Sequence, residues 1–170
     1  VASGSEDQTI LVWNLEEKKQ EFTLKGHHMA VTTIDIASSN REIASGSQDC
    51  SVKIWNVDKR ALEFTLEGHT HAVTAVAFLK NDQQVASSSW DTTIKLWSLQ
   101  SRSVIHTLSG HSHLVTALEI TTDYKFLFSG AQNGQIKMWD IERRCEVACF
   151  KGHSKAVEAL TLSSDGRRLF

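Results

Sequence analysis

Serine, histidine and aspartate recur in this sequence in a combination that suggests nucleophilic catalysis. The two sets, 42 residues apart, are His27, Ser45, Asp49 and Trp55, and His69, Ser87, Asp91 and Trp97. A catalytic serine needs a histidine base, a carboxylate that orients this base, and an exposed position beside an oxyanion hole. These serines instead fall inside segments with the alternating pattern of strands, and the set recurs. The repetition therefore favours a structural role over a hydrolase site.

A third set departs from the other two at the carboxylate. Its members are His111, Ser129, Asn133 and Trp139. The amide of Asn133 carries no charge that could orient the imidazole of His111. We therefore expect a weaker histidine link in this unit, and we predict that Asn133→Asp stabilises the protein.

Two histidine pairs, His69 with His71 and His111 with His113, are candidate metal ligands because residues two apart in an extended segment share a face. No nearby cysteine or carboxylate completes a coordination shell. The three cysteines also lack the paired spacing of a structural zinc site. We expect no metal and no cofactor, and we expect the cysteines to be reduced thiols of an intracellular protein.

The chain repeats with a period of 42 residues, and four periods nearly fill its 170 residues. The recurring Gly-His pairs and tryptophans are Gly26-His27, Gly68-His69, Gly110-His111 and Gly152-His153, and Trp13, Trp55, Trp97 and Trp139. Each unit contains four short alternating segments separated by turn residues, which predicts four strands. No segment sustains a helical period. The expected fold class is all-β, with four-stranded antiparallel sheets packed face to face around an axis.

This period, with Gly-His opening each unit and Trp closing its third strand, resembles the WD-repeat β-propeller family over the whole chain. Two features depart from the family pattern. Only Trp139-Asp140 keeps the literal Trp-Asp pair, and Ser164-Asp165-Gly166 is the only trace of the frequent Ser-Pro-Asp-Gly turn. The resemblance implies a propeller arc of four-stranded blades, a fragment of a ring of about seven or eight blades.

The same resemblance implies that the members of each His, Ser, Asp and Trp set form a buried hydrogen-bonded network. Two serines of one unit, Ser45 and Ser47, alternate to the same side of the strand. By analogy with the family, Ser45 is the expected network residue, with Ser3, Ser87 and Ser129 as its equivalents.

The repeat boundaries predict a single propeller segment over residues 1–170. We expect 1–25 to form three strands of an incomplete blade, 26–67, 68–109 and 110–151 to form three repeats, and 152–170 to start a further repeat. An open arc exposes apolar flanks and strand edges. We therefore expect the remaining blades of a parent chain, or a second copy, to close the ring. Self-closure into four blades is the least favoured arrangement.

By resemblance, the loops at one end of the blades form a binding face. The expected partner-binding residues are Trp90, Leu114, Gln48, Gln132, Thr74 and Thr116. Trp90 is the only tryptophan outside the 42-residue register, so packing shared by all units does not explain it. An exposed aromatic residue is a frequent binding hot spot. Alternatively, Trp90 folds over its own turn or caps a neighbouring loop.

The charge balance argues against nucleic acid and membrane partners. The chain has 18 Lys and Arg against 20 Asp and Glu, a formal net charge of -2. One row of basic residues recurs every 42 positions, but acidic neighbours offset it, so we expect a solvated edge of mixed charge. This row is Lys18, Arg60, Arg102 and Arg144. No apolar stretch reaches the roughly 18 residues of a membrane span.

The function that these features favour is a non-catalytic scaffold that binds proteins or peptides through its loop faces, in the cytoplasm or nucleus. The alternative is a targeting or regulatory segment of a multidomain enzyme, such as a kinase or a ubiquitin-ligase assembly, whose catalytic domain lies outside this chain. The fold alone does not decide between them.

Overall fold

The computed structural model describes residues 1–170, with the side chain of Asn81 outside the description. It contains fifteen β-strands and one three-residue 3-10 helix, Lys80–Asp82. The strands are β1 (Ala2–Gly4), β2 (Thr9–Asn14), β3 (Lys19–Lys25), β4 (Val31–Ile36), β5 (Glu42–Ser47), β6 (Val52–Asn56), β7 (Ala61–Leu66), β8 (Val73–Phe78), β9 (Gln84–Ser89), β10 (Ile94–Ser98), β11 (Ser103–Leu108), β12 (Val115–Ile120), β13 (Phe126–Ala131), β14 (Gln135–Asp140) and β15 (Cys145–Lys151).

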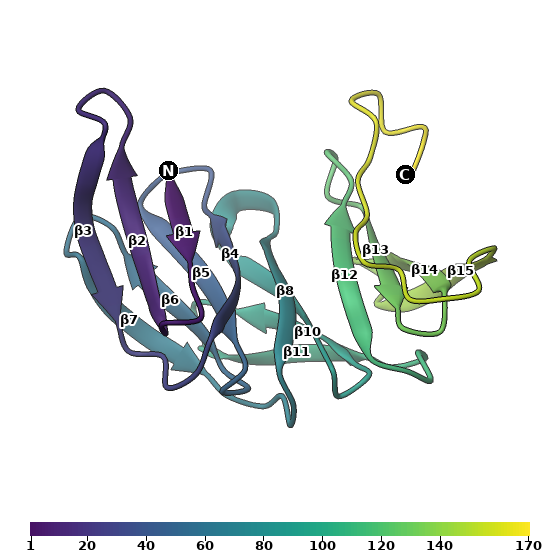
Figure 1. Cartoon of the computed structure of the whole chain (residues 1–170). Coiled ribbons are helices and arrows are strands. Elements are labelled where there is room, and N and C mark those ends of the chain that lie inside the picture. Colours follow the sequence, from purple (N-terminus) through teal and green to yellow (C-terminus); the bar gives the residue numbers. More distant parts are fainter.

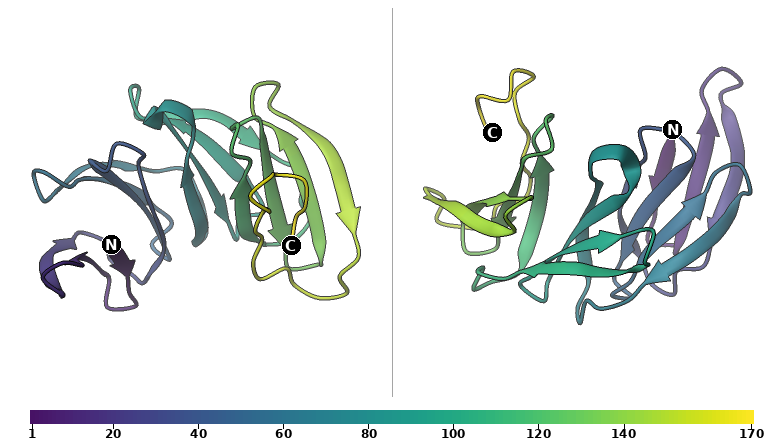
Figure 2. Two further views of the ribbon diagram at one scale, coloured as in Figure 1. Left: turned by 90° about the horizontal axis from the view of Figure 1, so that it is seen from above. Right: turned by 180° about the vertical axis from the view of Figure 1, so that it is seen from behind.

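Each strand pairs with its sequence neighbour, so the strands form four antiparallel sheets. The first sheet has three strands, β1–β3, and the second (β4–β7), third (β8–β11) and fourth (β12–β15) sheets have four each. Figure 1 and Figure 2 show the sheets side by side along a curved arc, with the two ends of the chain at opposite ends of the arc. The expected open arc of all-β blades is confirmed.

Irregularities in the sheets recur with the sequence period. A register shift follows the first residue of β4, β8 and β12, and another precedes the tryptophan of β2, β6, β10 and β14. Such bulges increase the local twist of a strand and change the direction of a side chain. Because they fall at equivalent positions, every tryptophan of the register has the same place in its sheet.

The apolar core lies between the sheets. One cluster joins Ile10 and Leu24 of the first sheet to Ile43 and Trp55 of the second. Two further clusters join the second sheet to the third and the third to the fourth, with Trp97 and Trp139 in the corresponding places. Each sheet therefore buries its flank on the next, which explains why the apolar positions share the 42-residue period.

Residues 152–170 contain no named strand. Leu162 and Leu169 form a single antiparallel bridge, and the backbone groups of Thr161 and Phe170 exchange hydrogen bonds of 3.1 and 2.9 Å around the turn between them. Leu162 N–H also donates to Glu119 Oε1 of the fourth sheet (3.2 Å). This segment thus lies against the fourth sheet as a loose hairpin, where the sequence pattern predicted a first strand and the beginning of a second.

Candidate functional site

The second and third sheets each bring a complete set of four network side chains together. In the second sheet, Trp55 Nε1–H donates to Ser45 Oγ (2.8 Å), Ser45 Oγ lies 2.7 Å from His27 Nε2, and His27 Nδ1 lies 2.8 Å from Asp49 Oδ2. In the third sheet the corresponding distances are 2.7, 2.8 and 2.7 Å. The chain of bonds therefore runs from the indole in the sheet to the carboxylate in the loop.

The charge state of this network follows from its burial and its hydrogen bonds. Burial by itself would raise the pKa of Asp49, but hydrogen bonds from Ser51, His28 and His27 outweigh it and hold the pKa well below its usual range. Burial lowers the pKa of His27 despite the neighbouring carboxylate. At neutral pH the pair is therefore an ionised aspartate and a neutral histidine.

This charge state assigns the donors. Ionised Asp49 only accepts, so Nδ1 of His27 carries the proton, and the Ser45 hydroxyl donates to Nε2 while its oxygen accepts the indole N–H. The arrangement of Ser45 and His27 resembles that of a catalytic pair. Ser45, however, is fully buried, with 0% of its surface exposed, and no substrate can reach it. The geometry stabilises the repeat and offers no nucleophile.

Ser47, the alternative network serine, has a separate role. Its hydroxyl donates to the Met29 carbonyl oxygen (3.1 Å) and accepts the backbone N–H of Asp49 (3.1 Å). Ser45 and Ser47 therefore both connect the second sheet to the loop before it, through different partners.

In the fourth sheet the network stops at the histidine. Trp139 Nε1–H donates to Ser129 Oγ (2.8 Å), and His111 Nε2 lies 2.7 Å from the same oxygen. The Nδ1 atom of His111 is buried and has no hydrogen-bond partner within the described part of the chain. Asn133 instead donates to Ser112 Oγ (3.2 Å) and to Gln135 Oε1 (3.1 Å). The link that the sequence predicts to be weaker is absent.

The missing carboxylate changes the electrostatics of His111. Burial, followed by the charge of Lys137, lowers the pKa of His111 to about 4. Lys137 itself is paired with Glu146 at 2.6 Å. The imidazole is therefore neutral at physiological pH and is left with one unsatisfied nitrogen.

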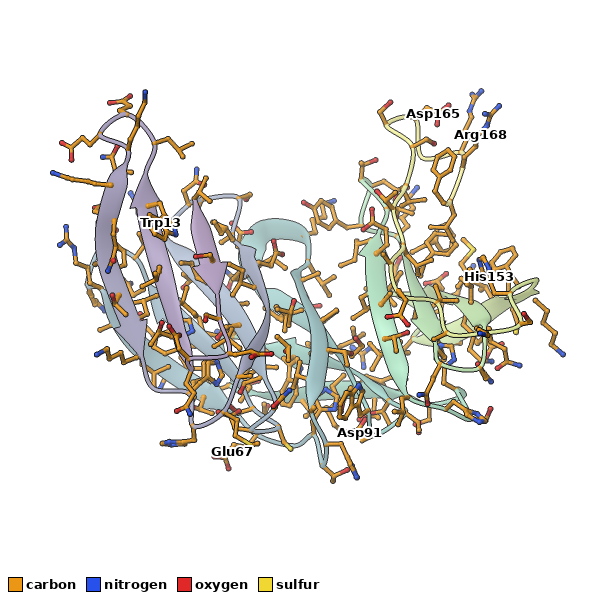
Figure 3. All side chains as sticks on the ribbon, in the orientation of Figure 1. Trp13, Glu67, Asp91, His153, Asp165 and Arg168 are labelled. Atoms are coloured by element: carbon orange, nitrogen blue, oxygen red, sulfur yellow. The ribbon has the colours of Figure 1, made fainter. Side chains whose placement is uncertain are left out.

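The loops that carry the predicted binding residues lie together at one end of the sheets. We call this end the loop face. In the four-stranded sheets it consists of the loop that precedes the sheet and the turn between the second and third strands. Backbone N–H groups of Gln48, Trp90 and Gln132 donate to the carbonyl groups of Ala30, Ala72 and Leu114, at 3.0, 3.0 and 2.9 Å. In Figure 3, Glu67 and Asp91 mark this face at the lower side of the view. Each turn is thus bonded to the loop beside it.

The predicted binding residues differ in how far they are exposed to solvent. Gln48 and Gln132 are exposed, Trp90 is 44% exposed, and Leu114 is half-buried. Trp90 is thus partly exposed on a backbone that is held in place, at a turn position where the other sheets have Glu6, Gln48 and Gln132.

Thr74 and Thr116, two of the predicted partner-binding residues, have hydroxyl groups that are engaged in hydrogen bonds. Both are half-buried, and each hydroxyl group donates to a carbonyl group of the segment that follows along the arc, the fourth sheet for Thr74 and the C-terminal segment for Thr116. Thr74 Oγ1–H donates to Val115 O (2.9 Å), and Thr116 Oγ1–H donates to Val157 O (2.5 Å). Thr32 makes the same bond to Val73 O. The recurrence of threonine every 42 residues was the available signal, because a position common to all units is a structural one.

The row of basic residues also has a role that the sequence pattern did not suggest. The guanidinium groups of Arg60 and Arg102 lie 5.0 and 4.7 Å from the ring centres of Phe22 and Phe64, each on the preceding sheet. Such cation–π contacts add to the packing between sheets. Both arginines are exposed, as expected for a solvated edge of mixed charge, and they also contact the neighbouring sheet.

Among the residues whose side chains are described, no group of three or more His, Cys, Asp and Glu could hold a metal ion. The described part of the chain also has no helix with the length and apolar character that crossing a membrane requires. Cys50, Cys145 and Cys149 are free thiols.

Comparison with known proteins shows which family has this architecture. Residues 18–56, 60–98 and 102–140 match the family described as "WD domain, G-beta repeat". The nuclear distribution protein nudF 2 of Penicillium rubens is 46% identical over 43 residues, which are 25% of this chain and 9% of that protein. The chain therefore matches only a small part of the length of this relative. Proteins with such repeats generally mediate protein–protein interactions and are typically non-catalytic. With three family matches over more than half of its length, the chain belongs to the WD40 repeat family.

Proposed function

We propose that this chain is a non-catalytic scaffold that binds proteins or peptides through the loop face, with Trp90 at the centre of the contact. The observation that supports this most is the exposure of Trp90 at the tip of a turn, outside the tryptophan register. Burial of a large aromatic side chain on binding is the commonest source of a hot spot. The exposed amides of Gln48 and Gln132, and Leu114, would contribute the surrounding contacts.

The preorganised backbone at Trp90 supports the same proposal. Its N–H group is bonded to Ala72 O, and Thr92 N–H donates to Ser89 O at 3.2 Å, so the turn has little freedom to lose. Thr74, in the same sheet, is bonded to Val115, the residue after Leu114. A partner that binds here would therefore lose little free energy in ordering the site.

The proposal includes an arrangement of repeats and a place in the cell. The repeats would be 26–67, 68–109 and 110–151, with 1–25 and 152–170 as parts of neighbouring blades. A mainly apolar hollow between the fourth sheet and the C-terminal segment is lined by Phe128, Ile136, Phe150, Leu162 and Leu169 among others. In our proposal a further blade covers it, as in a closed ring. The free thiols favour an intracellular protein.

Removal of the aromatic side chain tests the binding role. With Trp90→Ala we expect the amount of specifically bound protein to fall about tenfold, because the hot-spot area is lost. The thermal unfolding midpoint should change little, since the side chain is outside the core. The measurement is quantitative mass spectrometry of proteins retained from a cell extract by the immobilised chain, with unfolding followed by circular dichroism.

Trp13→Ala provides the matched control for this experiment. Trp13 is 37% exposed, similar to Trp90, but it belongs to the tryptophan register. The control should retain the bound proteins that Trp90→Ala loses. If both variants retain the same proteins in the same amounts, or if Trp90→Ala unfolds in parallel with its loss of binding, the proposal is wrong.

A further inference from the structure

A second candidate site lies at the opposite end of the sheets from the loop face. We call this end the turn face. In the four-stranded sheets it contains the turn between the first and second strands and the turn between the third and fourth strands. In Figure 3, Asp165 and Arg168 mark this side, at the top of the view and away from Asp91. Between the third and fourth sheets it contains a cavity of about 460 Å³, lined by Lys80, Leu96, Ile105, Tyr124, Ile141 and Arg144 among others. We call this cavity the Tyr124 groove.

A related hollow between the second and third sheets allows a direct comparison. This middle groove has a volume of about 370 Å³ and is lined by Glu42, Glu63, Phe64, Asp82 and Leu99 among others. Because the sheets repeat every 42 residues, each position of the middle groove has an equivalent in the Tyr124 groove. Differences between the two therefore show what is particular to one site.

Carboxylates tie the second and third sheets together beside the middle groove at two points. Asp82 accepts hydrogen bonds from Ser38 N–H (3.0 Å), the Ser38 hydroxyl (2.7 Å) and Ser39 N–H (3.0 Å) of the preceding sheet. Asp35 accepts the backbone N–H of Phe78 of the following sheet (2.7 Å). Together these bonds tie the turns and the inner strands of the second and third sheets to each other.

Neither carboxylate has an equivalent at the Tyr124 groove. Tyr124 stands at the position of Asp82, Lys80 at that of Ser38, and Ala77 at that of Asp35. Arg144 also lacks the ring that lies beneath Arg102, because His106 stands at the position of Phe64. The contacts that tie the second sheet to the third at this face are therefore missing between the third and fourth, and Arg144 lines the groove instead.

The two grooves differ in charge as well. The carboxylates Glu42, Glu63 and Asp82 line the middle groove, and burial together with the charges of Glu63 and Asp82 raises the pKa of Glu42. At the equivalent positions the Tyr124 groove has Gln84, Ile105 and Tyr124. Three negative charges are thus replaced by an amide, an aliphatic side chain and an aromatic ring.

Two carboxylates at the rim of the Tyr124 groove, Asp123 and Asp140, are engaged by neighbouring residues. Asp123 accepts bonds from the Thr121 hydroxyl (2.7 Å) and from Lys125 N–H, and Asp140 accepts Arg143 N–H (2.7 Å).

Lys80 and Arg144 are exposed and have no ion pair among the described side chains. Glu142 is the one lining carboxylate without a hydrogen bond or ion pair in the described part. The lining has three cations and three carboxylates, of which Asp123 is paired with Lys125 (3.7 Å) and Asp140 with Arg143 (3.8 Å). Two cations and one carboxylate of the lining are therefore left without an ion pair among the described side chains.

Tyr124 itself is held in an unfavourable backbone conformation. Its φ angle is +58°, in the left-handed region, and its ring is 38% exposed. The matching turn positions are Asn40, Asp82 and Gly166, residues that tolerate this region better than a bulky one. More than a third of this residue nevertheless stays exposed, so burial offsets the strain only in part. Strain of this kind is typically retained at functional sites.

We propose that the Tyr124 groove binds an extended peptide segment of a partner protein, with an apolar side chain on the floor and acidic side chains at the cationic rim. Leu96, Ile105 and Ile141 form the apolar floor, and the Tyr124 ring is a wall against which the anchor packs. Lys80 and Arg144 attract the carboxylates that follow the anchor. This site lies at the opposite end of the sheets from Trp90 and does not depend on the function proposed for the loop face.

Three short peptides with blocked ends test this chemistry on the intact chain. Their core sequences are Leu-Phe-Glu-Glu, Leu-Phe-Lys-Lys and Ser-Ser-Glu-Glu, which vary the charge and the anchor separately. Titrations are followed by shifts of assigned backbone amide signals. We expect saturable shifts around the Tyr124 groove with the first peptide only. The absence of saturation there, equal binding of the lysine peptide, or shifts confined to the loop face would overturn the proposal.

Tyr124→Gly separates binding from structure. Glycine adopts the left-handed φ freely, so the melting temperature should stay the same or rise by a few degrees, while affinity for the Leu-Phe-Glu-Glu peptide falls about fivefold. Asn40→Gly, in the matching turn of the second sheet, should leave affinity unchanged. Full affinity of folded Tyr124→Gly would contradict the proposal.

A second variant tests peptide binding at the Tyr124 groove if Tyr124→Gly fails to fold. Ile105→Glu introduces the residue that the middle groove has at its equivalent position, Glu63, which is tolerated there. It makes the floor acidic, so we expect it to abolish binding of the acidic peptide. Unchanged affinity of this variant would overturn the proposal.

Discussion

Ser45→Ala is expected to lower the free energy of unfolding by about 2–6 kcal/mol, a larger effect than we expect for the other substitutions. The Ser45 hydroxyl accepts the Trp55 indole N–H and donates to His27 Nε2, so its removal leaves two buried polar groups without a partner. Each such group costs about 1–3 kcal/mol. The measurement is chemical denaturation, monitored by tryptophan fluorescence.

Ser3→Ala is the matched control for Ser45→Ala. Ser3 Oγ accepts the indole N–H of Trp13 at 2.9 Å in an exposed environment, and no histidine bonds to it. Water can replace this hydroxyl, so we expect a loss below about 0.5 kcal/mol. Similar losses for Ser3→Ala and Ser45→Ala would mean that burial of the network contributes little to its stability.

Asn133→Asp is expected to raise the free energy of unfolding by about 1–2 kcal/mol at pH 7. The new carboxylate would lie where Asp49 and Asp91 lie in the preceding sheets, and it would accept the N–H of His111 Nδ1, which now has no partner in the described part of the chain. Thermal and chemical unfolding at pH 7 measure the gain. The reverse change in the third sheet, Asp91→Asn, should reduce stability by a similar amount.

The pH dependence of Asn133→Asp provides an independent check. In the native chain the pKa of His111 is lowered to about 4, against 6.5 in the unfolded chain, so the unfolded state binds more protons between these values. Stability from this group is complete above pH 6.5 and is lost as the pH falls towards 4. A carboxylate at position 133 would raise the pKa of His111 and reduce this loss. An unchanged acid sensitivity would mean that the new carboxylate does not reach the imidazole.

Much of the architecture could be predicted because its determinants recur. The Gly-His pairs, the tryptophans and the alternating apolar residues share one period, so each repeat independently indicates the same four strands. The departure at Asn133 was also visible, since any break in a strict repeat marks a local change. The position of Trp90 stood out for the same reason, and the structure places its side chain in solvent.

Contacts between repeats were harder to predict than the repeats themselves. By resemblance to the family, Thr74 and Thr116 were expected on the binding face, and the structure shows that their hydroxyl groups bond to Val115 and Val157 of the segments that follow. Arg60 and Arg102 were expected at a solvated edge of mixed charge, and both are exposed, but their guanidinium groups also lie over rings of the preceding sheet. In both cases the contact is made with an atom of another repeat, which inspection of a single unit cannot reveal.

The linear order of residues was thus sufficient to define the repeating unit, its strands and the members of each buried network, because backbone pattern and hydrogen-bonding chemistry are local properties that recur at a constant interval. The Tyr124 groove and the engaged threonines became apparent only in three dimensions. They depend on which side chains of two neighbouring sheets face each other, and the loss of Asp82 and Ser38 equivalents matters only because these positions meet across an interface. Contacts between sheets arise from pairs of positions about one period apart, so neither partner alone indicates whether the interface is closed or open.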